Sequence, residues 1–345
     1  MLVVDDSALL RRVIISVLTE DPEIEVVGAA RDGLEAIEMV DRLLPDAVTL
    51  DIEMPRLDGL GALAVIHERH PRIPVVMFST LTERGAASTL EALSKGASDY
   101  VTKPSNSGSV SESLASVREQ LVARVKGLVG ARRVVAARPV VRRPAAPLGA
   151  RPEVVVIASS TGGPDALTKV LSSLPGALDV PVLVTQHMPP VFTAMLAERL
   201  DRTSPMTVRE AVDGDVPRAG EVLVAPGDHH LRVERHGGVV RAVVDQGPPE
   251  NFCRPAADPM FRSAAEVYGA GVLALVLTGM GQDGLVGARE VSRRGGRILV
   301  QDELTSVVWG MPGSVAEAGL AHEVLALDAI APRLAALARS AARAG

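Results

Sequence analysis

The stretch that decides the fold is Val154-Val155-Val156-Ile157-Ala158-Ser159-Ser160-Thr161-Gly162-Gly163. Its β-branched run, bounded by small polar residues, predicts a buried parallel strand. The glycine pair allows a tight turn, and Pro164 after it is typical of the first turn of a helix. A hydroxyl at such a turn lies at the carboxyl edge of a sheet, beside unsatisfied helix N–H groups. Taken alone, the turn is more simply a helix cap or a phosphate cradle, because single glycine-rich turns are weak signals.

The composition sets limits on the class of protein. The chain has 345 residues, which favours two domains, and 47% of them are hydrophobic, so large cores are possible. Aromatic residues are only 2%, so we expect cores of Val, Leu, Ile and Ala. The net charge of -6 argues against a nucleic-acid-binding protein, which would need a basic surface. The single cysteine, Cys253, excludes a disulfide framework within the chain.

The first residues show no targeting signal. Val3-Val4 leads directly into Asp5-Asp6, unlike a signal peptide. No apolar run approaches the roughly 20 residues that a membrane span requires. We therefore expect a soluble, cytoplasmic protein without direct membrane insertion.

Alternating strands and helices predict a doubly wound parallel sheet over residues 1–125. The predicted strands are 1–4, 24–29, 47–50, 75–78 and 100–102. The predicted helices cover residues 9–18, 33–44, 60–67 and 86–93.

Polar residues follow the ends of these strands and would gather at one edge of the sheet: Asp5, Asp6, Asp51, Ser79 and Lys103. Taken singly, each of these is more simply a loop or cap residue. That explanation does not account for all five residues at successive strand ends. Clustered carboxylates repel unless a hard cation lies among them, and Mg²⁺ prefers oxygen ligands. The central carboxylate could then attack a phosphoryl group, while the cation and the lysine neutralise its charge.

The motifs Val3–Ser7, Leu50–Gly59 and Lys103-Pro104 resemble those of a response-regulator receiver domain. The resemblance implies a flavodoxin-like fold with Asp51 as phosphoacceptor, Ser79 as switch hydroxyl and Lys103 as the family's lysine. It also implies Mg²⁺ bound by Asp5, Asp6, Asp51 and the backbone carbonyl of Glu53. Receivers usually carry more residues before this Val-Val-Asp-Asp, so we expect a short first strand.

Residues 126–151 predict a flexible connector. Arginines alternate with Ala, Val and Pro, and no acidic residue is present. Pro139, Pro144 and Pro147 interrupt regular structure, so we expect an extended, solvated linker between two domains.

Residues 152–345 predict a second doubly wound α/β sheet, with a hairpin turn at His236-Gly237-Gly238. Ser160, His187 and Asp283 each follow a predicted parallel strand, so they converge at one edge. An imidazole can accept the proton of a serine nucleophile, and a carboxylate orients the imidazole. Backbone N–H groups near Met280 and Gly281, or at the Thr161 helix start, could form an oxyanion hole. Taken singly, Ser160 is more simply a helix cap, His187 a histidine with ordinary hydrogen-bond partners, and Asp283 a turn residue. Taken together, the three predict a serine hydrolase.

Three motifs resemble the catalytic motifs of the chemotaxis protein-glutamate methylesterase family (CheB): Ala158–Gly163, Thr185–Pro189 and Leu277–Gly284. Ala225–His230 and Val307–Pro312 also fit its pattern, so with the receiver the likeness covers nearly the whole chain. The resemblance implies an α/β esterase domain with Ser160 as nucleophile, His187 as base and Asp283 as orienting acid. It implies the Met280 amide as an oxyanion donor.

The family likeness also implies an activity and partners. The activity is hydrolysis of glutamyl methyl esters on the cytoplasmic helices of chemoreceptors, with deamidation of receptor glutamines as a related reaction and no cofactor for the esterase. A chemotaxis histidine kinase is the implied phosphodonor for Asp51. We expect the unphosphorylated receiver to pack over the Ser160 cleft.

The chain departs from the family pattern at three places. Ala158-Ser159 stands where Gly-Ala is usual, so Ser159 is a second candidate nucleophile, although Ser160 directly precedes Thr-Gly-Gly. Cys253-Arg254-Pro255 stands where His-Arg-Pro is common, and Gln282 replaces a frequent Asn. No catalytic motif surrounds Cys253, so we expect a buried or spectator thiol. His229-His230 cannot chelate one ion together, because adjacent strand residues point to opposite faces.

Three alternatives stay open. The same esterase could serve a chemosensory system other than chemotaxis. A receiver with a binding output, such as a transcription factor, is disfavoured by the acidic balance and the lack of a terminal three-helix module. A broad serine hydrolase acting on peptides or lipids would need substrate profiling to be separated from the esterase.

Overall fold

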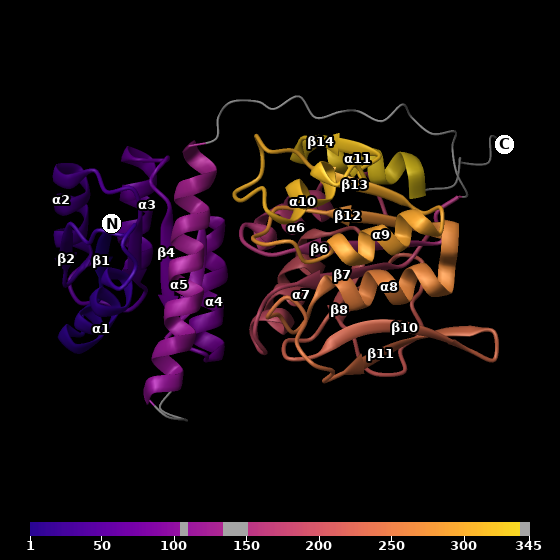
Figure 1. Cartoon of the computed structure of the whole chain (residues 1–345), viewed down its shortest axis with the longest axis horizontal. Coiled ribbons are helices and arrows are strands. Elements are labelled where there is room, and N and C mark those ends of the chain that lie inside the picture. The colour runs from indigo at the N-terminus through magenta and orange to yellow at the C-terminus, as the bar shows by residue number, and fades with distance from the viewer. Residues whose placement is uncertain (104–109, 134–150, 339–345) are drawn as a thin grey trace. The chain divides into compact units, whose positions relative to one another are not determined.

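The computed structural model describes residues 1–103, 110–133 and 151–338. The chain divides into two compact units, Met1–Ala136 and Ala137–Gly345 (Figure 1). No helix within the described ranges has the length and apolar character needed to cross a bilayer.

The first unit is built on a five-stranded sheet in the order β2-β1-β3-β4-β5. All of its strand pairs are parallel, which confirms the predicted doubly wound sheet. Its strands are β1 (Leu2–Val4), β2 (Gly28–Ala30), β3 (Val48–Asp51), β4 (Val75–Ser79) and β5 (Asp99–Thr102). Its helices are α1 (Ala8–Thr19), α2 (Gly33–Leu43), α3 (Gly59–Arg69), α4 (Glu83–Ser94) and α5 (Val110–Arg133).

Two elements of the first unit differ from the prediction. Strand β2 does not include Ile24, because the N–H of Ile24 donates to the carbonyl of Asp21 in a turn. Helix α5 was not predicted, and residues 126–133 are helical rather than an extended linker. Leu121, Val125 and Leu128 are buried at helical spacing, which is the apolar stripe that holds such a helix. The rest of the predicted linker, 134–150, lies outside the described residues, as does Pro104.

The second unit contains a seven-stranded parallel sheet in the order β14-β13-β12-β6-β7-β9-β8. Its strands are β6 (Val154–Ser159), β7 (Val182–Gln186), β8 (Thr207–Glu210), β9 (Glu221–Val224), β12 (Val272–Val276), β13 (Arg297–Gln301) and β14 (Glu323–Leu325). The antiparallel pair β10 (His230–His236) and β11 (Val239–Asp245) forms the predicted hairpin.

The helices of the second unit follow the expected alternation with strands. They are α6 (Gly163–Ser172), α7 (Phe192–Thr203), α8 (Ala257–Tyr268), α9 (Leu285–Arg293), α10 (Met311–Glu317) and α11 (Leu327–Ala338), with a 3-10 turn, η1, at Gly269–Gly271. Helix α8 packs against both β6 and β10 (Figure 1). Its residues Met260 and Phe261 lie in the hydrophobic core. Residues 339–345, which follow α11, lie outside the described part of the chain.

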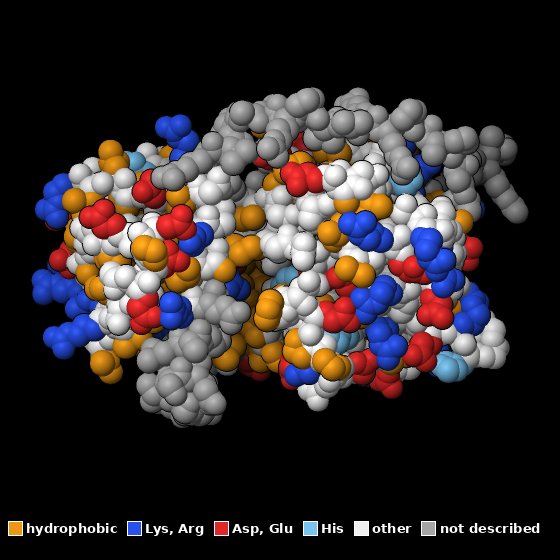
Figure 2. All heavy atoms as spheres, in the orientation of Figure 1, with side chains coloured by type: hydrophobic (Ala, Val, Ile, Leu, Met, Phe, Trp, Pro, Cys, Tyr) orange, Lys and Arg blue, Asp and Glu red, His pale blue; other side chains and the backbone are white. Residues whose placement is uncertain are grey.

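Strands β12, β6 and β7 occupy the centre of the sheet and position the site. Val276 is level with Ala158 on β6, and Ser159 is level with Gln186 on β7. The residues that follow these strands therefore emerge side by side at the carboxyl edge. Away from this edge, Lys and Arg side chains mix with Asp and Glu over α8 and α9 (Figure 2), where Glu290 pairs with Arg293 and Arg294.

Candidate active site and acidic cluster

His187 and Asp283 meet at the carboxyl edge of the second sheet. His187 Nε2 lies 2.7 Å from Asp283 Oδ2, the distance of a charge-assisted hydrogen bond. Because Nε2 is engaged in this way, a substrate-side proton can reach only the other ring nitrogen, Nδ1, which lies 3.4 Å from Cys253 Sγ. The structure thus brings together two of the three predicted residues, and Ser160 follows the neighbouring strand β6.

Asp283 is surrounded by hydrogen-bond donors. Besides His187, its carboxylate accepts from the backbone N–H groups of Ala257 (2.6 Å), Asp258 (3.1 Å) and Gly284 (2.9 Å). Burial raises the pKa of Asp283, but the bonds from His187 and the backbone N–H groups prevail and hold it below the usual value. The carboxylate is therefore ionised and fixed in orientation.

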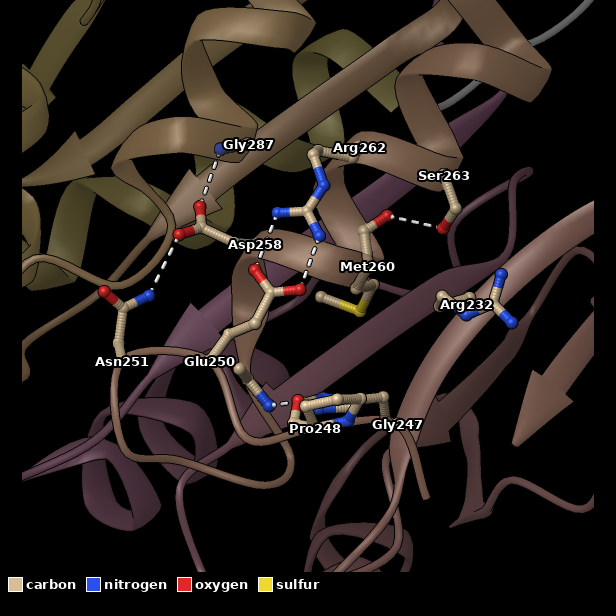
Figure 3. Close-up of polar contacts among 12 residues, drawn as sticks. Arg232, Gly247, Pro248, Glu250, Asn251, Asp258, Met260, Arg262, Ser263 and Gly287 are labelled. Carbon is tan, nitrogen blue, oxygen red and sulfur yellow. Dashed lines mark hydrogen bonds and ion pairs between the residues drawn. The ribbon is translucent and has the colours of Figure 1, made fainter. Parts of the chain in front are cut away.

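Two further residues complete the network around Asp283. The Asn251 amide donates to Asp258 Oδ2 at 3.0 Å (Figure 3). It also donates to Asp283 Oδ1 at 3.0 Å, so it bridges two carboxylates. Asp258 Oδ1 also accepts the Gly287 N–H at 2.6 Å, which ties α8 to the first turn of α9. Burial and the neighbouring Asp283 raise the pKa of Asp258 to about 6. No sequence motif marked Asn251 or Asp258.

The two adjacent serines have different surroundings. Ser159 is fully buried, and its hydroxyl donates to Gln186 Oε1 at 2.7 Å. Gln186 Nε2 in turn donates to the Ser160 carbonyl at 2.9 Å, which fixes the turn. Ser160 is partly exposed at the start of that turn. The accessible hydroxyl of the pair is therefore that of Ser160.

The loop after β12 packs directly against Ser160. The Ser160 N–H donates to the Thr278 carbonyl at 3.1 Å. A Cβ on Gly279 would lie 2.9 Å from the Ser160 Cβ and would overlap the Met311 sulfur, so only glycine fits there. Met280, the next residue, is half-buried, and its backbone N–H has no acceptor among the described residues. Such an amide is available to an oxyanion.

Cys253 is not the buried or spectator thiol that the sequence predicts. It is half-buried, and its sulfur lies 3.4 Å from His187 Nδ1. Burial lowers the pKa of His187, but Cys253 and Asp283 raise it and prevail. No sequence motif indicates this contact, because the two residues are far apart in the sequence. The pair His229-His230, by contrast, is held by the backbone carbonyls of Gly227 and Pro248.

In the first unit, the predicted acidic residues form a cluster. Oxygen atoms of Asp5, Asp6 and Asp51 lie within 4.8 Å of one another. Lys103 Nζ is 2.7 Å from Asp51 Oδ2 and 3.4 Å from Asp5 Oδ2. Burial raises the pKa of Asp51 to about 6, against the opposing effect of Lys103. Both Oδ2 atoms are buried and accept no hydrogen bond of suitable angle from the residues described, so the donor set fits a hard cation.

The remaining predicted residues of this site are placed differently. The Ser79 hydroxyl donates to the Gly85 carbonyl at 3.0 Å and accepts from Thr89 Oγ1 at 2.6 Å, so it faces α4. Glu53 follows β3 two residues after Asp51, with its side chain exposed. The structure thus brings together the three aspartates and Lys103. The Ser79 hydroxyl instead forms its hydrogen bonds with α4.

Comparison with known proteins identifies the family of each part of the chain. The family model of the CheB methylesterase matches residues 155–334, and that of the response regulator receiver domain matches residues 1–115. A protein named protein-glutamate methylesterase/protein-glutamine glutaminase from Nocardioides sp. is 51% identical over 97% of this chain and 94% of its own. A protein of the same name from Trichodesmium erythraeum is 45% identical over 97% of each chain.

A solved structure extends the comparison to the fold. The Thermotoga maritima CheB methylesterase catalytic domain is 45% identical, with a TM-score of 0.53, over 55% of this chain and 100% of that one. The matched share of the chain is about the size of the second unit. The chain therefore belongs to the CheB methylesterase family and carries a response regulator receiver domain before its esterase domain.

Proposed function

We propose that the chain is a phosphorylation-regulated protein-glutamate methylesterase and glutamine deamidase, with Ser160 as nucleophile, His187 as base and Asp283 as orienting acid. The observation that carries this proposal is the 2.7 Å bond between His187 and Asp283 at the sheet edge that also presents Ser160. The names of the relatives supply the substrate class.

The geometry supports a two-step acyl transfer. His187 Nδ1 gives up its contact with Cys253 Sγ and takes the proton of Ser160 Oγ as the bond from Oγ to the ester carbon forms. The oxyanion accepts the Met280 N–H, and collapse breaks the C–OCH₃ bond, so that methanol leaves with the proton from His187. Water activated by His187 then cleaves the acyl-enzyme, which frees Ser160 and the glutamate. With a glutamine side chain the leaving group is ammonia.

For the receiver, we propose Asp51 as the phosphoacceptor and a chemotaxis histidine kinase as the phosphodonor. Asp5, Asp6, Asp51 and the Glu53 backbone carbonyl would hold Mg²⁺, which supplies positive charge to the phosphoryl oxygens. Lys103 stays beside Asp51 and offsets the remaining negative charge. The switch role of Ser79 requires its hydroxyl to leave Thr89 and turn toward Asp51.

We also propose the setting in which this enzyme works. The substrate is a methylated helix of a chemoreceptor, reached in the cytoplasm. The catalytic domain begins at residue 152, and the receiver extends to the end of α5 at Arg133. A broad hydrolase of peptides or lipids is separated from this proposal by substrate profiling.

Methanol release from methylated receptor fragments tests the assignment of the nucleophile. We expect Ser160→Ala to lower kcat by about 10⁴-fold or more, because it removes the hydroxyl on which the acyl-enzyme forms. Ser159→Ala is the matched control. It keeps the nucleophile and loses only a buried hydrogen bond, which costs about 1 kcal/mol of stability. Full activity of Ser160→Ala would overturn the proposal.

A further inference from the structure

Two residues beside the candidate active site combine an exposed apolar side chain with an unfavourable backbone conformation. Phe252 is 93% exposed and has a φ of 61°. Val191 is 36% exposed and has a φ of 71° with a ψ of -47°. A positive φ is uncommon for any residue with a Cβ, and for a bulky or β-branched residue it marks strain. Neither residue is part of the core, so packing does not account for the strain.

Phe252 lies at the tip of a two-residue turn. The N–H of Glu250 donates to the Cys253 carbonyl at 3.1 Å, and the N–H of Cys253 donates to the Glu250 carbonyl at 2.9 Å. Asn251 has a φ of 51°, so both central residues have the positive φ of a type I′ turn. Such turns favour Asn followed by Gly. Asn251 fits this preference and Phe252 does not.

The turn keeps this shape because its other residues are anchored. The Glu250 carboxylate forms two bonds to Arg262, at 2.6 and 2.8 Å (Figure 3). The Asn251 amide holds Asp258 and Asp283, as described above. Beyond the turn, Arg254 pairs with Asp228 at 2.6 Å. These contacts hold the backbone while the Phe252 side chain itself projects into solvent.

Val191 belongs to a second loop, which is connected to the turn that carries Phe252. Its φ and ψ approach those of the rare γ-turn with a positive φ. It follows Pro190, whose backbone packs so closely on Gly227 that a Cβ on Gly227 would overlap it. The next residue, Asp228, is the partner of Arg254. The loops that carry Val191 and Phe252 are therefore linked through the Asp228–Arg254 ion pair.

We propose that Phe252 and Val191 form an apolar rim that docks the protein segment carrying the glutamyl methyl ester. This inference deepens the proposed function and rests on it. The neighbours of Phe252 are Asn251 and Cys253, which contact Asp283 and His187, so the turn that carries the exposed ring lies beside these two residues. An esterified glutamate is uncharged, and on a helix the residues three and four positions away share its face. The rim therefore binds apolar residues on that face of the helix, next to the esterified glutamate.

Relief of the strain provides the test. In Phe252→Gly the turn gains the Asn-Gly sequence that it favours, and Val191→Gly places a suitable residue at a helix N-cap. We expect the thermal midpoint of unfolding to hold or rise in both variants. We also compare two substrates, a methylated receptor fragment and a blocked single-residue glutamate methyl ester. The ratio of kcat/KM for the fragment to kcat/KM for the small ester should fall about tenfold or more, mainly because KM for the fragment rises. Phe252→Asn, which also tolerates a positive φ, repeats the measurement with a second side chain.

Val239→Thr is the matched control, because Val239 is also an exposed apolar residue but lies at the start of β11 with an ordinary backbone. Its ratio of the two kcat/KM values should equal that of the wild type. A wild-type ratio in Phe252→Gly and Phe252→Asn would overturn the docking rim. An equal loss on both substrates would also overturn it, since the turn would then act through His187 and Asp283. Wild-type protein that releases no methanol from either ester would instead refute the proposed function.

Discussion

At the scale of single residues, we expect the contact between Cys253 and His187, the proposed base, to affect the pH dependence of the reaction. A base must be neutral to accept a proton, and the sulfur and Asp283 both favour the charged imidazole. Cys253→Ala removes the first of these influences and lowers the pKa of His187. We therefore expect the acidic limb of the kcat/KM profile, measured with a small methyl ester, to move to lower pH. Cys253→Ser, which keeps a polar atom there, should move it less. An unchanged limb in Cys253→Ala would show that the sulfur does not influence the base.

The sequence located the residues that follow strands better than those that support them. Ser160, His187 and Asp283 could be found because the end of a parallel strand has a known place on the sheet. Asn251 and Asp258 could not, since their contact with Asp283 depends on how a loop and the start of α8 fold back on the sheet. A single sequence contains no signal for such a tertiary contact between distant segments.

At the scale of elements, the closeness of the β12 loop to the β6 turn makes Gly279 sensitive to any side chain. In Gly279→Ala the new methyl would press on Ser160 and on the Met311 sulfur. We expect kcat for ester hydrolysis to fall at least about tenfold, because small displacements of a nucleophile are costly. The measurement is methanol release at saturating substrate.

Gly271→Ala is the control for this variant. Gly271 precedes the opposite end of β12, and a Cβ there would meet only the flexible side chain of Glu153, at 3.0 Å. Its kcat should stay within about twofold of the wild type, since flexible surface side chains can move aside. Equal losses in the two variants would mean that strand stability, and not the position of Ser160, sets the rate.

Elements with a strong apolar pattern were predicted well, and those without one were not. Strands β6 and β12 are continuous apolar runs that only the centre of a parallel sheet accommodates. Strand β2 was predicted too long, because Ile24–Val27 has the composition of a strand but begins within a turn. Helix α5 was missed, although Leu121, Val125 and Leu128 have helical spacing, because the arginines and prolines after it suggested a linker.

At the scale of the whole molecule, the receiver should restrain the esterase until Asp51 is phosphorylated. We expect residues 152–345 alone to release methanol about 5- to 100-fold faster than the unphosphorylated full chain, the usual range of coupling between domains. The corresponding domain of Thermotoga maritima has been crystallised as a separate chain, so this comparison is practicable.

In the full chain, acetyl phosphate with Mg²⁺ should raise the rate toward that of the separate domain. Asp51→Asn should abolish this response and leave the unstimulated rate as it was. A separate domain no faster than the unphosphorylated full chain would rule out inhibition by the receiver.

The pairing of β6 with β12 has a consequence for how the enzyme is made. These strands are sheet neighbours, yet β7, β8, β9 and the β10–β11 hairpin lie between them in the chain. On the ribosome, Ser160 and His187 emerge long before Asp283, and the strand that completes the centre of the sheet comes late. Non-local pairing of this kind is slow and leaves apolar strand edges exposed during synthesis. A nascent chain that stops before β12 thus carries Ser160 and His187 without Asp283, and we expect it to be a client of chaperones rather than a partly active esterase.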